Sequence, residues 1–578
     1  MRRNHVIRIV KAVEANRGRL CWLLLAAIVS VLASLAGPWL IGKTIDAMVG
    51  KGQVDLGTIF KILSLLAGLY TIGNLFGWLL AYLSNRVAYL TVNNLRQQLF
   101  DKLNNLPLRF FDSNPHGDTI DRFINDLDTV SDGITQGLAT LLTGLVTIVG
   151  AIAFMLSLSP VLTLVVALAA PVSLLVARFI TKRSQRLFRE QAKDLGDLNG
   201  YIEEMISGQK VVQAFRFEQR SLEQFKKINQ KLYQSGVQSQ FYGSLAGPTT
   251  RLVNNIAYSA VGLIGSIAAI LGKVTIGDIS SFLIYATLFA KPFNDITAVL
   301  TQIQAAAAAT RRIVEVLDLT PETSDQPDAL QINPQQGRIG FHHVHFAYQS
   351  NQPLIVNFNL QIEPGSRIAI VGPTGAGKTT LVNLLMRFYE VDQGAITIDG
   401  ININRISRDN LRRSFGMVLQ DTWLFAGSIR DNIAYGRPEA SDAAIIAAAK
   451  AADAHGFIRR LPQGYDTLIT DAGENLSQGQ KQLLTIARVM LVDPPMLILD
   501  EATSNIDTRT ELRIQQAFLK MVTGRTSFII AHRLSTVREA DLILVMDQGN
   551  IVESGTHEQL LAQGGPYSRL YHSQFAPV

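Results

Sequence analysis

Long apolar runs alternate with charged, amphipathic stretches through the first half of the chain. A helix of about 20 apolar residues crosses the roughly 30 Å hydrocarbon layer of a bilayer. Six such runs predict an all-α transmembrane domain over residues 1–319, with both of its ends on the same side of the membrane. The predicted spans lie near residues 20–42, 59–83, 138–158, 162–180, 252–271 and 281–303.

The connections between these spans are of two kinds. Those after the first, third and fifth spans are short and weakly charged, whereas residues 84–135 and 181–248 form long connections after the second and fourth. Apolar positions recur with helical period in both long segments. Each is long enough for two helices that extend about 30 to 40 Å beyond the bilayer. We therefore predict long intracellular helices rather than disordered loops.

Two charged residues interrupt the sixth apolar run. Lys291 and Asp295 flank Pro292 within it, where a charge costs about 3 kcal/mol on insertion scales. They either line a translocation path or belong to a span kinked at Pro292, in which the two charges, four residues apart, satisfy each other. Asn254 and Asn255 in the fifth run have a simpler interpretation, as polar residues in helix packing.

Composition and charge agree with a membrane protein. Of 578 residues, 48% are hydrophobic and only 17% are charged, and mean hydropathy is positive. Six Lys or Arg residues between Arg2 and Arg19 precede the first span, which favours a cytosolic N-terminus over nucleic-acid binding. No small-residue cleavage site follows, so we expect no cleaved signal peptide. Cys21 is the only cysteine, which excludes an intrachain disulfide.

The second half has a different pattern. A segment rich in Pro, Asp and Ser, residues 320–336, predicts a linker, and strands alternate with helices over residues 337–578. In this part GPTGAGKTT follows the strand-like RIAIV and precedes a helical pattern, the context of a phosphate-binding loop. Lys378 then reaches the β- and γ-phosphates, and Thr379 binds Mg²⁺. The predicted loop comprises Gly372, Pro373, Thr374, Gly375, Ala376, Gly377, Lys378, Thr379 and Thr380.

Two carboxylates follow the buried strand MLIL. Asp500 and Glu501 come at its carboxyl end, where open parallel sheets carry out nucleotide chemistry. Adjacent carboxylates can divide the work, with Asp500 holding Mg²⁺ through water. Glu501 then polarises the attacking water as general base.

Three further residues fit a nucleotide site. His532 ends the strand-like IIAH and can hydrogen-bond a γ-phosphate, a role that the motifs before it support. Gln420 follows the strand-like MVL and suits a Mg²⁺ or water ligand that changes position with the nucleotide state. Tyr348 offers a ring on which adenine can stack, although an aromatic residue at a strand end is more often a packing residue.

With these motifs in order, the whole chain resembles a half-size ATP-binding cassette exporter. The resemblance is carried by Walker A (372–380), the glutamine of the Q-loop (420), the signature (476–480), Walker B (496–501), the D-loop (504–507) and the switch histidine (532). The segments LPLRFFDSNPHGDTIDRFINDLDTV and ISGQKVVQAFRFEQRSLEQF resemble the intracellular loops of such exporters, and Glu474 matches an acidic residue that touches them. The implied fold is a six-helix transmembrane domain followed by an α/β P-loop nucleotide-binding domain.

The resemblance also implies a mechanism. ATP and Mg²⁺ are the expected cofactors, and two chains assemble head to tail so that each ATP lies between Walker A of one chain and the signature of the other. Hydrolysis drives alternating access, by which amphipathic drugs, lipids or peptides are exported across the membrane. The expected location is a bacterial cell membrane, with the nucleotide-binding domain in the cytosol. The residues expected on the partner's ATP are Ser477, Gly479, Gln480 and Asp507.

One departure from the family pattern bears on the partner. Gln478 replaces the first glycine of the signature LSGGQ, while Glu501 is kept. In this family an altered signature tends to face a partner that lacks the Walker B glutamate, so a heterodimer with one degenerate site is favoured over a homodimer. A non-pumping, nucleotide-gated channel or regulator is the alternative class, and Glu501 and His532 argue against it. A peptidase-containing peptide exporter is not expected.

Overall fold

The computed structural model describes residues 17–48, 54–331, 336–349, 351–420, 422–470, 473, 475–500, 507–530 and 537–574. These residues divide into two compact units. The first is helical and ends at Leu319, and the second contains all the described strands. Asn105–Ser113, within the range assigned from sequence to the transmembrane domain, belongs to the second unit. The predicted fold class, a helical membrane domain followed by an α/β domain, is confirmed.

Six long helices make up most of the first unit, and each predicted span falls within one of them, apart from the last residue of the fifth span, Leu271, which follows the end of its helix. Five are long and apolar enough to cross a membrane within the described residues. The helix of the sixth predicted span, α10, which carries Lys291 and Asp295, is not among them. The helices are α2 (Arg17–Asp46), α3 (Leu56–Asn104), α6 (Leu127–Leu158), α7 (Pro160–Ser207), α9 (Glu218–Ile270) and α10 (Ile276–Leu317).

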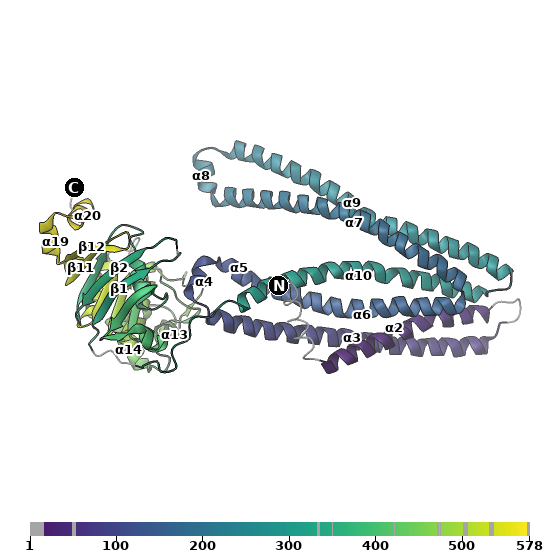
Figure 1. Cartoon of the computed structure of the whole chain (residues 1–578), viewed down its shortest axis with the longest axis horizontal. Helices are drawn as coiled ribbons and strands as arrows, with labels where there is room; N and C mark the ends of the chain where they lie inside the picture. The colour runs from purple at the N-terminus through teal and green to yellow at the C-terminus, as the bar shows by residue number, and fades with distance from the viewer. Residues whose placement is uncertain are drawn as a thin grey trace. The chain divides into compact units, whose positions relative to one another are not determined.

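Four of these helices, α2, α3, α6 and α10, pack as a bundle, while α7 and α9 pair chiefly with each other (Figure 1). Close approach of α6 to α10 depends on a small residue, because a Cβ at Gly133 would lie 2.3 Å from that of Ala306. Arg312 of α10 binds the buried Asp126 through two nitrogens. Asp126 ends a π-helical turn, η1 (Arg122–Asp126), between α5 (His116–Asp121) and α6.

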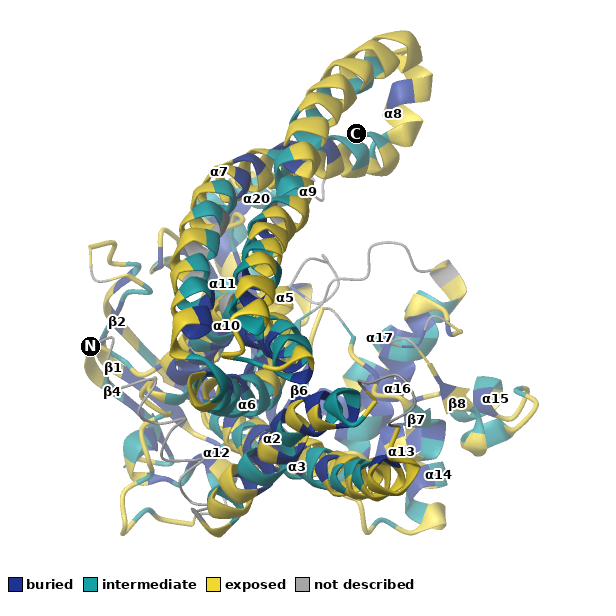
Figure 2. Cartoon of the chain, turned by 90° about the vertical axis from the view of Figure 1, so that its right-hand side faces the viewer, coloured by how far each residue is buried: buried dark blue, intermediate teal, exposed yellow. Residues whose placement is uncertain are grey.

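The helical pair α7 and α9 extends well past its apolar spans, as the sequence predicts, and ends at a short helix, α8 (Gln209–Ala214). Figure 2 shows exposed residues along much of both helices and around α8. Two contacts join the helices of this extension. Lys231 forms an ion pair with the buried Asp194 at 2.8 Å, and the Tyr201 hydroxyl donates a hydrogen bond to the Ser221 carbonyl oxygen at 3.0 Å.

The second unit is built on two main sheets. One is antiparallel in the order β2-β1-β4-β5, and the other has the order β12-β11-β3-β10-β9-β6, in which only the β11–β12 pair is antiparallel. The strands are β1 (Ile339–Phe346), β2 (Ile355–Ile362), β3 (Arg367–Val371), β4 (Gln393–Ile398), β5 (Ile401–Asn402), β6 (Phe415–Val418), β9 (Met496–Asp500), β10 (Thr526–Ile530), β11 (Leu542–Asp547) and β12 (Asn550–Gly555), with a small pair β7 (Gly427–Ser428) and β8 (Leu468–Ile469).

Two large apolar cores stabilise this unit. One joins the antiparallel sheet to β3 and α11, and the other joins α13, α14, α16 and α17 to β6 and β9. The central strands are buried on both faces, which explains their continuous apolar runs. The helices are α4 (Leu108–Ser113), α11 (Lys378–Leu385), α12 (Arg408–Arg413), α13 (Ile429–Ala434), α14 (Asp442–Ala451), α15 (His455–Ile458), α16 (Gln478–Val492), α17 (Thr508–Val522), α19 (His557–Gln563) and α20 (Pro566–Gln574).

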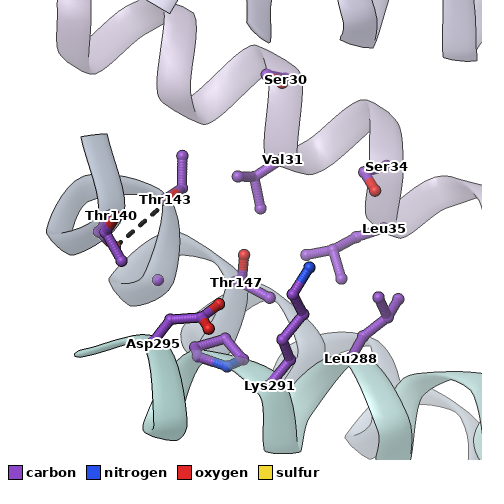
Figure 3. A pocket seen from close by; sticks show the side chains of 12 residues that line it. Ser30, Val31, Ser34, Leu35, Thr140, Thr143, Thr147, Leu288, Lys291 and Asp295 are labelled. Carbon is purple, nitrogen blue, oxygen red and sulfur yellow. Dashed lines mark hydrogen bonds between the residues drawn. The ribbon is translucent and has the colours of Figure 1, made fainter. Parts of the chain in front are cut away.

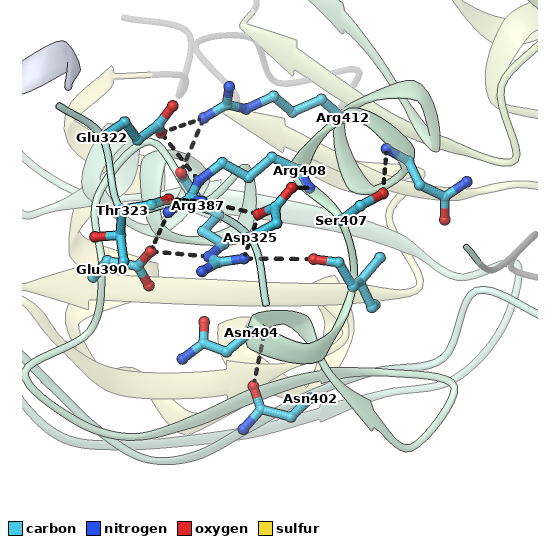
Figure 4. Close-up of polar contacts among 12 residues, drawn as sticks. Glu322, Thr323, Asp325, Arg387, Glu390, Asn402, Asn404, Ser407, Arg408 and Arg412 are labelled. Carbon is cyan, nitrogen blue, oxygen red and sulfur yellow. Dashed lines mark hydrogen bonds and ion pairs between the residues drawn. The ribbon is translucent and has the colours of Figure 1, made fainter. Parts of the chain in front are cut away.

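The first part of the predicted linker packs as part of the second unit. Leu330 exchanges backbone hydrogen bonds with Arg405 and Ser407 at 2.8 and 3.1 Å. Three carboxylates and three guanidinium groups form a clamp that fixes the same segment (Figure 4). This charged clamp comprises Glu322, Asp325 and Glu390 with Arg387, Arg408 and Arg412.

Candidate functional site

The candidate site lies at one edge of the larger sheet. Strands β3, β10, β9 and β6 are adjacent and parallel, so their carboxyl ends meet at this edge. Ile530 at the end of β10 pairs with both Ile370 of β3 and Asp500 of β9. The loops after these strands carry the predicted Walker A, Walker B and Q-loop residues, and ligands of open α/β sheets bind at such an edge.

The loop after β3 has a backbone that only glycine adopts readily. Gly372, Gly375 and Gly377 have φ values of +150°, +84° and +93°. A Cβ at Gly372 would lie 2.2 Å from the backbone oxygen of Met546. Gly377 is the N-cap of α11 and provides no side-chain cap, so the first N–H groups of this helix are available to an anion. The loop can therefore wrap a polyphosphate.

Lys378 begins the helix and its side chain turns back over the loop. Its ammonium group donates hydrogen bonds to the carbonyl oxygens of Gly372 and Pro373 at 2.7 and 2.9 Å. Burial lowers the pKa of Lys378, and the nearby Asp500 carboxylate partly offsets this effect. Walker A and Walker B charges are thus brought together, although they are 122 residues apart in the sequence.

Two threonines follow Lys378 with different surroundings. Thr379 is exposed and therefore accessible to a metal ion, whereas Thr380 is 5% exposed. The Tyr348 hydroxyl donates to the Thr380 hydroxyl at 3.2 Å, so Tyr348 lies beside the phosphate-binding loop. Its ring also packs edge to face against Phe346 and Tyr389. Tyr348 is therefore a packing residue that also lies next to the phosphate-binding loop.

The remaining predicted residues of this edge are placed in part. Gln420 is exposed two residues beyond the end of β6, next to the strand that ends at Asp500. Pro373, Thr374 and Gly375 are exposed, and Ala376 is buried. Glu501, His532, Glu474 and residues 504–506 of the D-loop lie outside the described residues.

The signature residues form the start of α16. Ser477 is its N-cap, and a capping box joins Ser477 to Gln480. The Ser477 oxygen accepts from the Gln480 N–H, which leaves its own O–H free to donate to a phosphate. Gln478 is the first residue of this helix, and its φ is not positive. Its side-chain amide donates a hydrogen bond to the Thr422 hydroxyl at 3.3 Å. Gly479 is buried. Glycine is therefore not required by the backbone at 478.

Asp507 has a structural role in the described residues. It is the N-cap of α17 and accepts a hydrogen bond from the Thr510 N–H at 3.0 Å. The backbone hydrogen bond from Thr510 lowers the pKa of Asp507. The carboxylate is exposed, so the cap keeps it ionised at the surface.

One group of residues near this site was missed from the sequence. The Arg109 guanidinium on α4 donates to the carbonyl oxygen of Tyr348 at 2.8 Å, and the Tyr389 hydroxyl donates to the Asp112 carboxylate. The contacting residues are 239 and 277 positions apart, so no local pattern announces the pairs. The only available signal was the resemblance of the segment from Leu106 to an exporter intracellular loop.

The donor set fits a magnesium nucleotide. The glycine loop, the start of α11 and Lys378 offer donors to phosphate oxygens. Thr379, Gln420 and Asp500 offer the oxygen ligands that Mg²⁺ prefers. Such an arrangement can position a γ-phosphate and stabilise charge that develops on it.

Comparisons with known proteins agree over almost the whole chain. A family profile described as ABC transporter transmembrane region matches residues 20–293, and one described as ABC transporter matches residues 355–504. The chain is 43% identical to the uncharacterized ABC transporter ATP-binding protein YfiC of Bacillus subtilis, over 98% of this chain and 94% of that protein.

A second relative carries a functional name. The fatty acid ABC transporter ATP-binding/permease protein of Mycobacterium bovis is 44% identical over 91% of this chain and 83% of that protein. Among solved structures, that of a bacterial Atm1-family ABC exporter with ATP bound matches with a TM-score of 0.77 and 30% identity. The match covers 97% of this chain and 99% of that one.

Proposed function

We propose, for a chain that belongs to the ATP-binding cassette transporter family, that it is one half of a dimeric exporter that moves amphipathic compounds across a membrane. The chain is a multi-pass, ATP-hydrolysing exporter half-transporter. The observation that carries the proposal is the fusion, in one chain, of apolar membrane-crossing helices to a phosphate-binding loop at the carboxyl edge of a parallel sheet. The name of the fatty acid relative supports a lipid-like cargo over a peptide.

The proposed chemistry assigns one role to each residue at the sheet edge. Thr379, Gln420 and Asp500 would hold Mg²⁺, which would neutralise phosphate charge. Glu501 accepts the proton of the attacking water, and His532 binds the γ-phosphate. We expect Glu501→Gln to abolish steady-state ATP hydrolysis while ATP binding is kept. Turnover equal to that of the unsubstituted protein would contradict this assignment, and transport without turnover would favour the channel alternative.

Exposed apolar residues support a second chain. Ile206 and Phe215, at the two sides of α8, are 69% and 78% exposed although the segment lies beyond the apolar spans. Such residues are costly in water and fit a protein partner. In the proposed orientation the N-terminus and the nucleotide-binding unit are cytosolic, and the spans lie in the cell membrane.

We favour a heterodimer because of Gln478. Its side chain lies at the start of α16 and donates a hydrogen bond to Thr422. A glycine at this position would leave the N-terminus of the helix open to a partner's nucleotide. A long side chain at this position obstructs the approach of phosphate, which a degenerate site tolerates. The partner would then lack a functional Walker B glutamate, and the single competent site would use this chain's Walker A and Glu501.

The test is ATP hydrolysis by the chain purified alone and with its candidate partner. We expect little activity alone and robust activity in the pair. Gln478→Gly in the pair should leave the rate within about twofold, because the affected site does not turn over. Robust hydrolysis by the chain alone, with a rate that changes strongly on Gln478→Gly, would establish the homodimer instead.

A further inference from the structure

A cavity of about 260 Å³ lies within the first unit, between α2, α6 and α10. Both charged residues of the sixth predicted span line it, Lys291 and Asp295 (Figure 3). The other walls are hydroxyl-bearing residues of α2 and α6 with a few apolar neighbours. The cavity is large enough for a small polar headgroup and too small for a complete lipid.

The two charges do not satisfy each other. In Figure 3 the Lys291 ammonium extends toward α2, whereas the Asp295 carboxylate is turned toward α6. Among the residues that the structure describes, no ion pair or hydrogen bond engages either side chain. The intrahelical pair that four-residue spacing permits is therefore not formed. Each charge is left to find its counterpart inside a membrane-spanning unit, where an unpaired charge is costly.

Two prolines interrupt the backbone hydrogen bonds of helices that line the same cavity. Proline has no N–H, so the carbonyl group four residues earlier loses its helical hydrogen bond. Pro292 in α10 frees the carbonyl of Leu288, and Pro38 in α2 frees that of Ser34. Leu288 and Ser34 both line the cavity. The acceptor that Figure 3 shows in the cavity is the Asp295 carboxylate, which suits a ligand that carries N–H donors.

Hydroxyl groups supply donors beside the ammonium. Ser34 and Thr147 line the cavity, and neither side chain has a hydrogen-bond partner within the described part of the chain. A hydroxyl can donate to an oxyanion that Lys291 attracts. The cavity thus offers donors for an anion and a carboxylate acceptor for a cation, and both charged residues are exposed and accessible to a ligand.

A second cavity, of about 390 Å³, adjoins the first and shares Leu288 and Lys291 with it. Its walls, from α7, α9 and α10, are apolar over most of their surface, and they also carry the polar residues Arg251, Asn254 and Asn255. Alkyl chains favour the apolar part of this lining. The pair of cavities therefore places the two charges of α10 next to a larger space with apolar surface and a second cation.

We propose that these cavities bind a zwitterionic amphiphile whose headgroup carries a primary ammonium and an oxyanion. The oxyanion binds Lys291 and the nearby hydroxyls, the ammonium binds Asp295, and the apolar chain lies along the apolar part of the second cavity. A singly charged ligand would leave the opposite protein charge unpaired, which disfavours fatty acids and simple cationic amphiphiles here. The proposal rests on the proposed function, since it names the class of compound that the exporter moves.

The experiment measures binding to the dimer in detergent without nucleotide, so it does not depend on transport. The probe is a tail-labelled, short-chain phosphatidylethanolamine followed by fluorescence anisotropy. Phosphatidylglycerol with the same chains tests a pure anion, phosphatidylcholine tests an ammonium without N–H groups, and free phosphoethanolamine tests the headgroup alone. We expect phosphatidylethanolamine to bind about tenfold or more tightly than each of the others.

Substitutions assign the selectivity to the two charges. Lys291→Gln and Asp295→Asn should each weaken phosphatidylethanolamine binding about tenfold, as expected for loss of one charge-assisted contact. Only Lys291→Gln should weaken phosphatidylglycerol binding. The exchanged double variant Lys291→Asp with Asp295→Lys should not recover binding, because the two sides of the cavity differ, whereas a mere intrahelical pair would be restored.

Matched controls are Lys273→Gln and Asp132→Asn, which lie outside both cavities and should bind like the unsubstituted protein. Equal affinity for the three lipids in the unsubstituted protein overturns the proposal without any variant. Unchanged affinity in both single variants also overturns it. Selective binding in a protein that fails to transport would uphold the site and count against the exporter assignment instead.

Discussion

The charged clamp around Arg408 permits a sharp test of how the first linker residues are held. Its side chain is 9% exposed, and its guanidinium group contacts Glu322, Asp325 and Glu390 at 3.2, 2.9 and 2.6 Å. Arg408→Met keeps much of the side-chain volume and removes the charge. Three carboxylates would then face two guanidinium groups, Arg387 and Arg412.

The magnitude follows from burial. Removing one partner of a buried ion pair costs about 3 to 5 kcal/mol. The three carboxylates are 28% to 40% exposed, so water can solvate them partly and the cost lies near the lower limit. We expect about 3 kcal/mol for Arg408→Met. Arg408→Lys keeps the charge but cannot span three carboxylates, and we expect about 1 to 2 kcal/mol.

Hydrogen exchange of the full-length protein in detergent measures this effect locally. The Glu322 N–H, bound to the Asn105 carbonyl oxygen at 2.7 Å, and the Leu330 N–H, bound to that of Arg405 at 2.8 Å, report on opening of the segment. A loss of about 3 kcal/mol raises their exchange about a hundredfold, since each 1.4 kcal/mol is tenfold.

The control is Arg413→Ala on the same helix. The Arg413 side chain is 78% exposed and, among the described residues, forms an ion pair only with Asp409, four residues earlier, so its loss should cost less than about 0.5 kcal/mol. If Arg408→Met changes exchange no more than Arg413→Ala does, the clamp does not hold the linker.

Two further outcomes follow from the geometry. Gly372→Ala should weaken ATP binding at least about tenfold, because its Cβ would lie 2.2 Å from the Met546 backbone oxygen. At Gly375 a Cβ would meet open space and only the positive φ is unfavourable, so Gly375→Ala should lower the free energy of ATP binding by only about 1 kcal/mol. Equal losses of ATP affinity in the two variants would refute the steric explanation. The hydrogen bond from Lys231 lowers the pKa of Asp194 in the folded protein. The contact therefore stabilises the α7–α9 extension fully at pH values above the unfolded pKa of about 3.9. This stabilisation is lost as the pH falls through the lower pKa of the folded state. Exchange of amides around Asp194 should therefore rise on acidification below about pH 4, and Asp194→Asn should remove that pH dependence.

Much of the fold could be predicted because the governing interactions are local. The six apolar runs and the helical period of the long connections correspond to continuous helices, with the connections ending in short helices such as α8. The alternation of apolar strands with helices predicts an α/β domain, which the structure has as a mainly parallel sheet. The glycine spacing of residues 372–377 predicts a phosphate-binding loop, and the loop has φ values that only glycine adopts readily.

Parts of the candidate site could not be predicted, because they join distant segments. Arg109 reaches Tyr348 only through the path of the chain, and Asp112 reaches Tyr389 in the same way. The sequence shows that Gln478 replaces a glycine of the signature, but it does not show the backbone conformation at this position. The structure gives it ordinary helical geometry and a contact with Thr422, so any effect on a partner's nucleotide comes from the side chain.

By itself the sequence determined the order of the elements, the membrane-crossing character of the first half and the chemistry of the phosphate-binding loop. Helical period, hydrophobic length and glycine φ preferences act within a few residues, so they can be read along the chain. Only the tertiary structure decided that Lys291 and Asp295 stand apart in one cavity and that Glu322 and Asp325 are held by buried arginines. Charges choose partners by distance and burial in three dimensions, and spacing along a helix does not determine either.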